Sequence, residues 1–315
     1  MKKVLFIGGS MNQTTMMHQV AEQIPEVRAH FSPFYGDRFV KWMTRHGFLH
    51  YTIAGGEFRG KSLRYLKRNG LLIDDGGSRN RYDLVVTSTD LVIPQNIRTQ
   101  PVIVVQEGMT DPDTWKTELV RKLRLPPYLA STSLAGLSKH YDRFCVASEG
   151  YKNFFVNRGA SSEKLAVTGI PNFDHFEKYL NNNFPHRDYV LCATTDMRET
   201  GKRDDRKAFI RNAFRIANGR KLIFKLHPNE KFERAHSEIE TYAPGAIVYS
   251  DGNVDEMIAN CAVLITQYST VTLTGMGLGK EVHSYWDVEK LRPLLPLQNK
   301  GQSAKNIANV CRQYL

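Results

Sequence analysis

Short apolar runs rich in β-branched residues alternate along the chain with amphipathic stretches of helical period. The runs cover residues 4–7, 84–87, 102–105, 143–146 and 165–167, and then residues 189–193, 222–226, 246–249, 263–266 and 282–285. Apolar strands that alternate with helices are typical of parallel sheets covered by helices on both faces. The pattern therefore predicts an α/β protein in which two doubly wound domains follow each other.

The predicted boundary between the domains lies near residues 172–187, where three consecutive asparagines, a proline and a histidine interrupt the pattern. We assign residues 1–175 to an amino-terminal domain, residues 176–187 to a linker and residues 188–315 to a carboxyl-terminal domain. Ligands of open parallel sheets bind beyond the carboxyl ends of the strands. The residues that follow each strand are therefore the candidates for chemistry.

Charge narrows the classes of partner. The 315 residues include 43 Lys and Arg against 32 Asp and Glu, a formal net charge of +11, which favours anionic partners. Residues 28–82 hold eleven of these basic residues against four acids, interleaved with aromatic residues. This segment predicts contact with an anionic membrane or a phosphate-linked acceptor; the alternative is a solvated helical face over core aromatics. No RNA-binding or helix-turn-helix signature accompanies the charge, so no nucleic acid partner is expected.

The four cysteines lie far apart, three of them within or beside apolar runs, which predicts buried reduced thiols in a cytosolic protein. No Cys-x2-Cys spacing indicates a zinc site, and no metal is expected. The first residues lack the apolar segment of a signal peptide, and no run of 18 apolar residues occurs. We therefore expect a cytoplasmic protein. Any contact with a membrane should be peripheral, at its inner face.

In the first half, Gly8, Gly9 and Ser10 follow the first strand and precede a helix, where they form a tight turn or contact an acceptor substrate. Three acids are candidates for the general base that takes a proton from an attacking hydroxyl: Glu107, and after it Asp90 and Asp111. Glu107 is preferred because it follows a strongly apolar strand almost directly and precedes a glycine. Each acid could instead cap a helix or lie at the surface.

Three loops of the second half bring hydroxyls and an imidazole to neighbouring strand ends. Thr194 and Thr195 follow one strand, His227 and Pro228 follow the next, and Ser269 and Thr270 follow a third. Such a set of donors can hold a monophosphate or diphosphate without a metal. Taken singly, Ser269 and Thr270 could be a helix cap and His227 an ordinary loop histidine.

Four stretches carry a family resemblance: residues 167–174 (VTGIPNFD), 225–228 (KLHP), 264–271 (LITQYSTV) and 278–280 (LGK). They resemble the donor domain of bacterial surface-polysaccharide transferases of the GT-B architecture. This group includes capsule-type glycosyltransferases, HP-motif sialyl- and Kdo-transferases and the glycerophosphotransferases of teichoic acid synthesis. The resemblance implies two Rossmann-like domains facing a central cleft.

The same resemblance implies a metal-independent glycosyltransferase that moves a sugar from a nucleotide-activated donor to a cell-envelope polysaccharide or lipid-linked acceptor. No cofactor is implied beyond the nucleotide-sugar substrate. His227 would take part in catalysis, and the donor nucleotide and its phosphate would contact these residues: Thr194, Thr195, His227, Pro228, Ser269, Thr270 and Thr274.

Three alternatives stay open. One is a glycerophosphotransferase that uses a CDP-activated donor, and another is a non-catalytic protein that binds a nucleotide sugar or glycan. The third is a non-hydrolysing UDP-N-acetylglucosamine 2-epimerase, which shares the scaffold and the Val-Thr-Gly signature. Three positions depart from the epimerase pattern: Gln106 in place of a catalytic glutamate, Asp196 near an expected histidine, and Leu273–Thr274 in place of ribose-binding acids.

Overall fold

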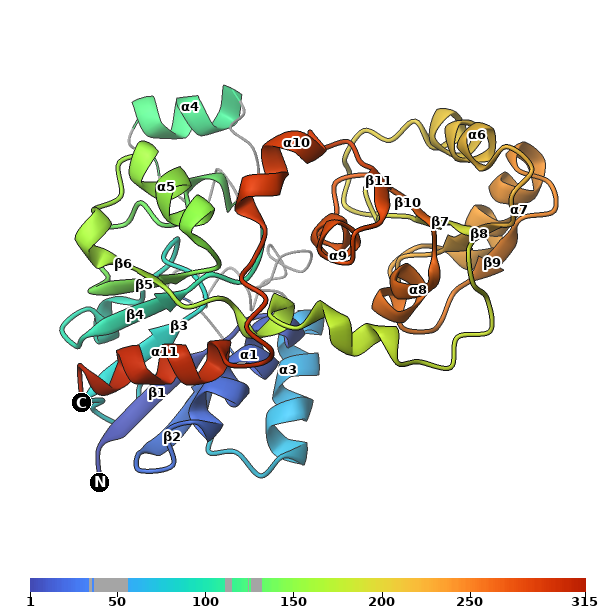
Figure 1. Ribbon diagram of the computed structural model, residues 1–315. Coiled ribbons are helices and arrows are strands. Elements are labelled where there is room, and N and C mark those ends of the chain that lie inside the picture. Colours follow the sequence, from blue (N-terminus) through green and yellow to red (C-terminus); the bar gives the residue numbers. More distant parts are fainter. Residues whose placement is uncertain (34–35, 37–55, 111–114, 124, 126–131) are drawn as a thin grey trace. The chain divides into compact units, whose positions relative to one another are not determined.

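The computed structural model describes residues 1–33, 36, 56–110, 115–123, 125 and 132–315, and the chain forms two compact units (Figure 1). Unit 1 comprises Met1–Asp174 together with Pro296–Leu315, and unit 2 comprises His175–Leu295. Each unit contains one sheet in which all the paired strands are parallel. The predicted α/β class with two doubly wound parts is confirmed.

The sheet of unit 1 has the strand order β2-β1-β3-β4-β5-β6. Its strands are β1 (Lys3–Ile7), β2 (Arg28–Ser32), β3 (Leu84–Thr87), β4 (Val102–Val105), β5 (Arg143–Val146) and β6 (Leu165–Val167). The helices are α1 (Met11–Glu22), α3 (Gly56–Arg68), α4 (Trp115–Lys122), α5 (Glu149–Asn157) and α11 (Ser303–Arg312), with short 3-10 turns η1 (Gln95–Ile97), η3 (Ser162–Lys164) and η4 (Pro171–Phe173). Strand β2 was not predicted, because its sequence RAHFS is too polar to form an apolar run.

Alternate residues of the strands pack on opposite faces of this sheet. Val4 and Phe6 of β1, with their counterparts on β3 and β4, pack against α1, α11 and Leu66 of α3. Figure 1 shows α1, α3 and α11 on this face and α4 and α5 on the other. The two-residue period of the strands thus supplies both core layers of a doubly wound sheet.

The sheet of unit 2 has the order β11-β10-β7-β8-β9. Its strands are β7 (Val190–Ala193), β8 (Leu222–Lys225), β9 (Ile247–Tyr249), β10 (Val263–Thr266) and β11 (Glu281–His283). The helices are α6 (Arg206–Ala217), α7 (Phe232–Tyr242), α8 (Val254–Asn260), α9 (Val271–Gly277) and α10 (Val288–Leu291), with η5 (Phe176–Leu180) and η6 (Arg292–Leu294). Because β10 returns to the far side of β7, the strand order reverses between β7 and β10.

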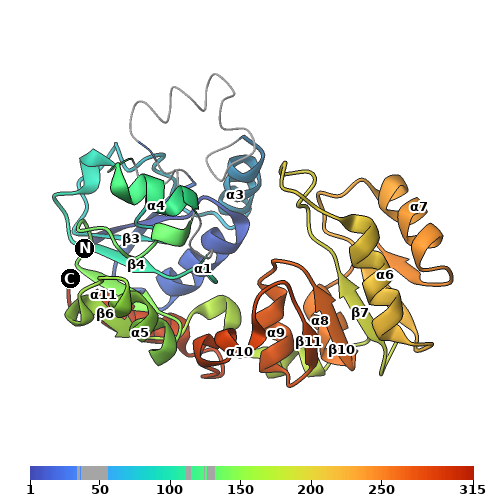
Figure 2. The same ribbon diagram turned by 90° about the horizontal axis from the view of Figure 1, so that it is seen from above.

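Both faces of the second sheet are covered. Val190 and Cys192 of β7 face α6 and α7, while Leu191 faces Met257 and Ile258 of α8. Figure 2 shows α6 and α7 on one side of this sheet and α8 and α9 on the other. All four cysteines of the chain are unpaired and buried, which confirms the predicted buried thiols.

The predicted domain limits are wrong at the carboxyl terminus. The last residues were assigned to the second domain, but Ile307 and Cys311 of α11 are fully buried in the core of unit 1. Residues 167–174 contact the beginning of α11. The backbone amide of Ser303 donates to Asp174 Oδ2 at 2.9 Å, and a Cβ on Gly169, which has φ +74°, would lie 2.3 Å from Ser303 Oγ. The predicted linker 176–187 likewise belongs to unit 2.

Candidate functional site in unit 2

The loops after β7, β8 and β10 lie side by side, because β7 is hydrogen-bonded to both other strands. Glu230 connects the first two loops. Its Oε2 accepts a hydrogen bond from the backbone amide of His227 at 2.9 Å, and it also accepts one from the Thr194 hydroxyl. The same His227 amide lies 3.2 Å from Thr194 Oγ1. The backbone of His227 is thus held by its own loop, through Glu230, and by the loop after β7, through Thr194.

A buried ion pair between Arg206 and Glu230 stabilises the loop after β8. Arg206 Nη2 lies 2.8 Å from Glu230 Oε1, and Arg206 Nε lies 3.0 Å from Asp204 Oδ2. The side chains of Arg206 and Glu230 are 5% and 1% exposed. A buried carboxylate is tolerated where it is paired and hydrogen-bonded, as Glu230 is here.

The two threonines of the loop after β7, which were predicted to contact the donor, form hydrogen bonds within the protein. Thr195 Oγ1 donates to Gln267 Oε1 at 2.6 Å, and Gln267 Nε2 donates to Asp204 Oδ1 at 2.7 Å. Thr194 donates to Glu230, and both threonines are buried. Their hydroxyls therefore hold the three loops together.

The imidazole of His227 is partly exposed. Its Nδ1 accepts the backbone N–H of Asn229 at 3.2 Å, so in the neutral ring the proton is on Nε2. Asp196 Oδ2 lies 3.6 Å from Nδ1 and accepts the side-chain amide of Asn229 at 2.8 Å. The ring can therefore offer Nε2–H to an anionic oxygen while Nδ1 is held by the loop.

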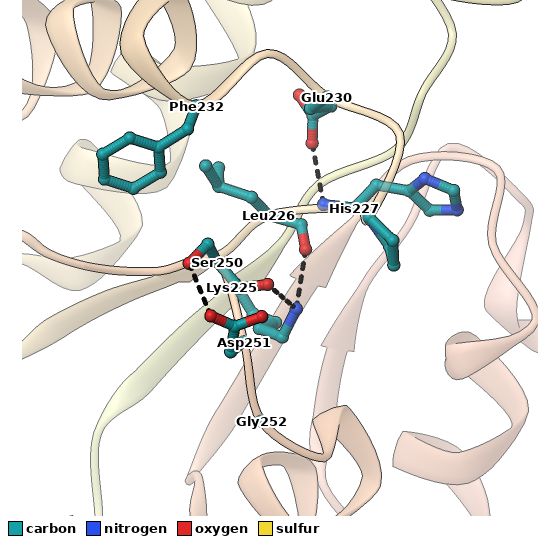
Figure 3. Close-up of a pocket in the computed structure, with 9 residues that line it drawn as sticks. Lys225, Leu226, His227, Glu230, Phe232, Ser250, Asp251 and Gly252 are labelled. Carbon is teal, nitrogen blue, oxygen red and sulfur yellow. Dashed lines mark hydrogen bonds between the residues drawn. The ribbon is translucent and has the colours of Figure 1, made fainter.

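A pocket of about 280 Å³ opens beside His227 at the ends of β8 and β9 (Figure 3). Lys225 Nζ donates to the carbonyls of Leu226 at 2.8 Å and Ser250 at 2.9 Å. Burial lowers the pKa of Lys225, and the nearby carboxylates of Asp251 and Glu230 oppose that shift. Three further residues that line the pocket are Pro228, Phe232 and Asp251.

The pocket combines an ammonium group, two carboxylates and an aromatic ring with the imidazole at its rim. Ser250 Oγ donates to Asp251 Oδ2 at 3.2 Å, and both residues are exposed. Lys225, Ser250 and Asp251 line the pocket although they were not predicted as site residues. The signal was available, because Ser250 and Asp251 follow the apolar strand 246–249 and so lie at the same sheet edge as His227.

The loop after β10 contains the hydroxyl of Thr270, which is not used within the described part of the chain. Thr270 is exposed at the start of α9, and within the described part of the chain its hydroxyl makes no hydrogen bond. Ser269 Oγ accepts the amide of Val271 at 3.5 Å. Thr274 differs from the prediction, because it is 1% exposed and donates to Asp255 Oδ1 at 3.0 Å. A buried Thr274 cannot contact a nucleotide directly.

Candidate residues of unit 1

Glu107 and the loop after β1 come together in unit 1. Ser10 Oγ donates to Glu107 Oε1 at 3.0 Å, and Gln13 Nε2 donates to Glu107 Oε2. A Cβ on Gly8 would lie 2.9 Å from the amide nitrogen of Thr14, so the loop needs a glycine there. Burial raises the pKa of Glu107, while the hydrogen bonds from Gln13 and Ser10 lower it.

The other two candidate acids do not join this cluster. Asp90 is buried, and its Oδ1 and Oδ2 accept the backbone amides of Gly136 at 2.8 Å and Ser138 at 2.9 Å. Burial raises the pKa of Asp90, whereas these hydrogen bonds lower it. The contacts assign Asp90 to holding the loop 136–138. Asp111 lies outside the described residues.

Only part of the basic segment 28–82 is described. Lys61, Arg64, Lys67 and Arg68 of α3 are exposed, and Arg59 pairs with Asp75. Membrane or acceptor contact through this segment stays a prediction.

No helix of the described residues is long and apolar enough to cross a membrane. In the same part of the chain, no cluster of three or more His, Cys, Asp or Glu side chains could hold a metal ion.

Comparison with known structures

Solved structures of similar architecture cover almost the whole chain. UDP-GlcNAc 2-epimerase from Neisseria meningitidis, bound to UDP-GlcNAc, matches with a TM-score of 0.58 at 12% identity, over 99% of this chain and 100% of that one. The S. aureus MnaA–UDP structure matches with a TM-score of 0.58 at 10% identity, over 100% and 97% of the two chains. A variant of the wall teichoic acid polymerase TagF matches with a TM-score of 0.52 at 13% identity, over 99% and 88%.

The chain has the GT-B fold. At these identities the likeness establishes the fold alone. No protein-family model matches the sequence, and no curated protein matches it either. Any assignment of activity to this GT-B chain therefore depends on its own residues.

Proposed function

We propose that this protein transfers a group, a sugar in the first instance, from a nucleotide-activated donor to a hydroxyl acceptor without a metal. The observation that carries the proposal is the pocket of unit 2, where Lys225, His227 and Asp251 surround about 280 Å³ at the carboxyl edge of a doubly wound sheet. Ligand sites of such sheets lie at this edge. Of the solved structures that resemble the chain, one is bound to UDP-GlcNAc and another is a complex with UDP.

In this proposal the nucleoside occupies the pocket, where the Asp251 carboxylate accepts hydrogen bonds from ligand hydroxyls. The donor phosphate contacts His227 Nε2–H and the hydroxyls of Ser269 and Thr270. These donors stabilise the negative charge that develops on the phosphate as its bond to the transferred group breaks. Glu107 accepts the proton of the acceptor hydroxyl while the hydroxyl oxygen forms the new bond and the electron pair of the broken bond leaves with the phosphate.

Gln106 supports transfer over epimerisation. Its Oε1 accepts the amide of Ala147 at 2.9 Å, its Nε2 donates to the carbonyl of Gly108 at 2.8 Å, and it is 4% exposed. An amide engaged on both sides supplies no acid or base chemistry at the place where an epimerase needs a glutamate. A glycerophosphotransferase would use the same pocket and phosphate contacts, so the donor decides between these two activities.

The test is a titration with UDP-, GDP- and CMP-activated sugars and CDP-glycerol, followed by a nucleotide-release assay with the donor that binds. Loss of the imidazole in His227→Ala should weaken binding of that donor by about 10- to 100-fold, the effect of one hydrogen bond to a charged group. His236→Ala, at an exposed histidine of α7, is the matched control and should bind normally. Full affinity in His227→Ala would refute the phosphate assignment. Tight binding with no turnover over any acceptor would favour a non-catalytic binding protein.

A further inference from the structure

Each carboxylate oxygen of Glu107 accepts a hydrogen bond, one from Ser10, the N-cap of α1, and one from Gln13 in its first turn. Glu107 follows β4, whereas Ser10 and Gln13 follow β1, and β3 lies between these two strands. The side chains therefore meet above the end of β3, across about 10 Å of sheet width at ~4.8 Å per strand. This is also where the strand order of unit 1 reverses, the place at which open sheets bind ligands.

The direction of both hydrogen bonds is fixed by the helix cap. Gln13 Oε1 accepts the backbone amides of Gly9 at 2.7 Å and Ser10 at 3.2 Å. A flipped amide would place its NH2 group against two N–H donors, so Nε2 must face Glu107. Ser10 Oγ accepts the backbone amide of Gln13 at 3.1 Å, which leaves its own proton for Glu107. The capping box of α1 thus presents two donors to one carboxylate.

In the described part of the chain, the groups that hydrogen-bond to this carboxylate are neutral. Burial raises the pKa of Glu107, only Gln13 and Ser10 lower it, and no charged side chain of the described residues contributes. Among the described residues Asp90 also has neutral donors, but Asp90 is 4% exposed, whereas Glu107 is partly exposed. A partly exposed carboxylate held by neutral donors keeps lone pairs within reach of a substrate proton, which suits a general base.

We propose that Gln13 is a positioning residue that aims Glu107 at the acceptor hydroxyl. Ser10 supplies the second fixed donor, and Glu107 remains the group that takes the proton. This inference rests on the proposed transfer activity for its purpose, whereas the coupling between Gln13 and Glu107 can be measured without any substrate.

The experiment compares unfolding free energies of the full chain between pH 4 and 9 for four proteins: wild type, Gln13→Met, Glu107→Gln and the double variant. A carboxyl with a raised pKa in the folded state binds protons that the unfolded state has released, so its contribution to stability falls as pH rises above the ordinary value of 4.5. Wild type should therefore lose stability relative to Glu107→Gln over that range. In Gln13→Met the loss should move to higher pH, because the carboxylate has lost one donor.

Gln13→Met also removes a cap, which lowers stability at every pH. The double variant isolates the effect of the lost cap, because it has no carboxyl group at position 107. Relative to Glu107→Gln, it should lose the same stability at every pH. Gln19→Met, at an exposed glutamine of the same helix, is the matched control and should leave the wild-type profile unchanged. A pH profile in Gln13→Met that coincides with that of wild type would overturn the inference whatever the activity.

Activity gives the second measurement once a donor is known. Gln13→Met should lower kcat by about 10-fold, the loss of one hydrogen bond to a charged group, with the KM for the donor unchanged. The acid limb of its pH–rate profile should move in the same direction as its stability profile. A changed donor KM with an unmoved acid limb would count against positioning. A shifted stability profile in a protein that turns over no donor would instead refute the proposed transfer.

Discussion

The loop that carries His227 depends on one buried acid, and Glu230→Ala is the change that tests this. Glu230 accepts hydrogen bonds from the His227 amide and the Thr194 hydroxyl and pairs with Arg206 at 2.8 Å. Removing one partner of a buried ion pair costs about 3–5 kcal/mol. Arg206 keeps Asp204 at 3.0 Å, which argues for the lower end, about 3 kcal/mol. Glu230→Gln retains an acceptor for the His227 amide and should cost about half as much.

Hydrogen exchange is the suitable assay because it reports on unit 2 strand by strand. The opening free energy of β7, β8 and β10 should fall by about 3 kcal/mol in Glu230→Ala, and the strands of unit 1 should keep theirs. Donor affinity should fall as well, since the imidazole loses its fixed backbone. Glu233→Ala, at an exposed acid of α7 three residues further on, should cost no more than about 1 kcal/mol. If Glu230→Ala were as stable as Glu233→Ala, the site would not depend on this ion pair and our reasoning would be refuted.

Three further outcomes follow from described contacts. Burial lowers the pKa of Lys225 in the folded protein. At pH values just below the ordinary pKa of 10.5, the unfolded chain therefore binds more protons than the folded chain. Urea titrations should show that wild type gains stability relative to Lys225→Met as the pH rises toward 10.5. Ile307→Ala should lower the stability of unit 1 by about 2–5 kcal/mol, seen as faster hydrogen exchange in β1 and β3 and unchanged exchange in β8. Tyr268, 48% exposed and in edge contact with Tyr285 at 5.4 Å, lies beside the predicted phosphate contacts. Tyr268→Ala should therefore weaken binding of a nucleotide sugar more than binding of the free nucleotide, as measured by calorimetry. Equal losses of affinity for the two ligands would contradict this prediction.

Apolar strands were predictable from the sequence because a doubly wound sheet buries them on both faces. Runs such as 84–87, 102–105 and 263–266 match the observed strands residue for residue. β2 was not predictable in this way. Its outer position in the sheet leaves Arg28 exposed, so no apolar run marks it.

Strand ends located the candidate site, but they could not say which side chains are free. Thr194 and Thr195 stand at the predicted edge and yet are committed to Glu230 and Gln267, contacts that join residues 36 and 72 positions apart. Thr274 is buried against Asp255. Hydrogen bonds over such separations depend on the strand order, which the apolar pattern alone does not give. The pairing of Glu107 with Ser10 was out of reach for the same reason, although each residue had been singled out.

The return of the last twenty residues to unit 1 has a consequence for the order in which the protein can be made. Unit 2 is one continuous stretch, His175–Leu295, whereas unit 1 needs Ile307 and Cys311 to complete its core. A chain emerging from the ribosome therefore presents every residue of the later unit before the earlier one is complete. Until residues 303–312 have emerged, α11 cannot cover its face of the first sheet. A chain that stopped before residue 296 would retain the whole pocket of unit 2 and lose the helix that closes the core around β1.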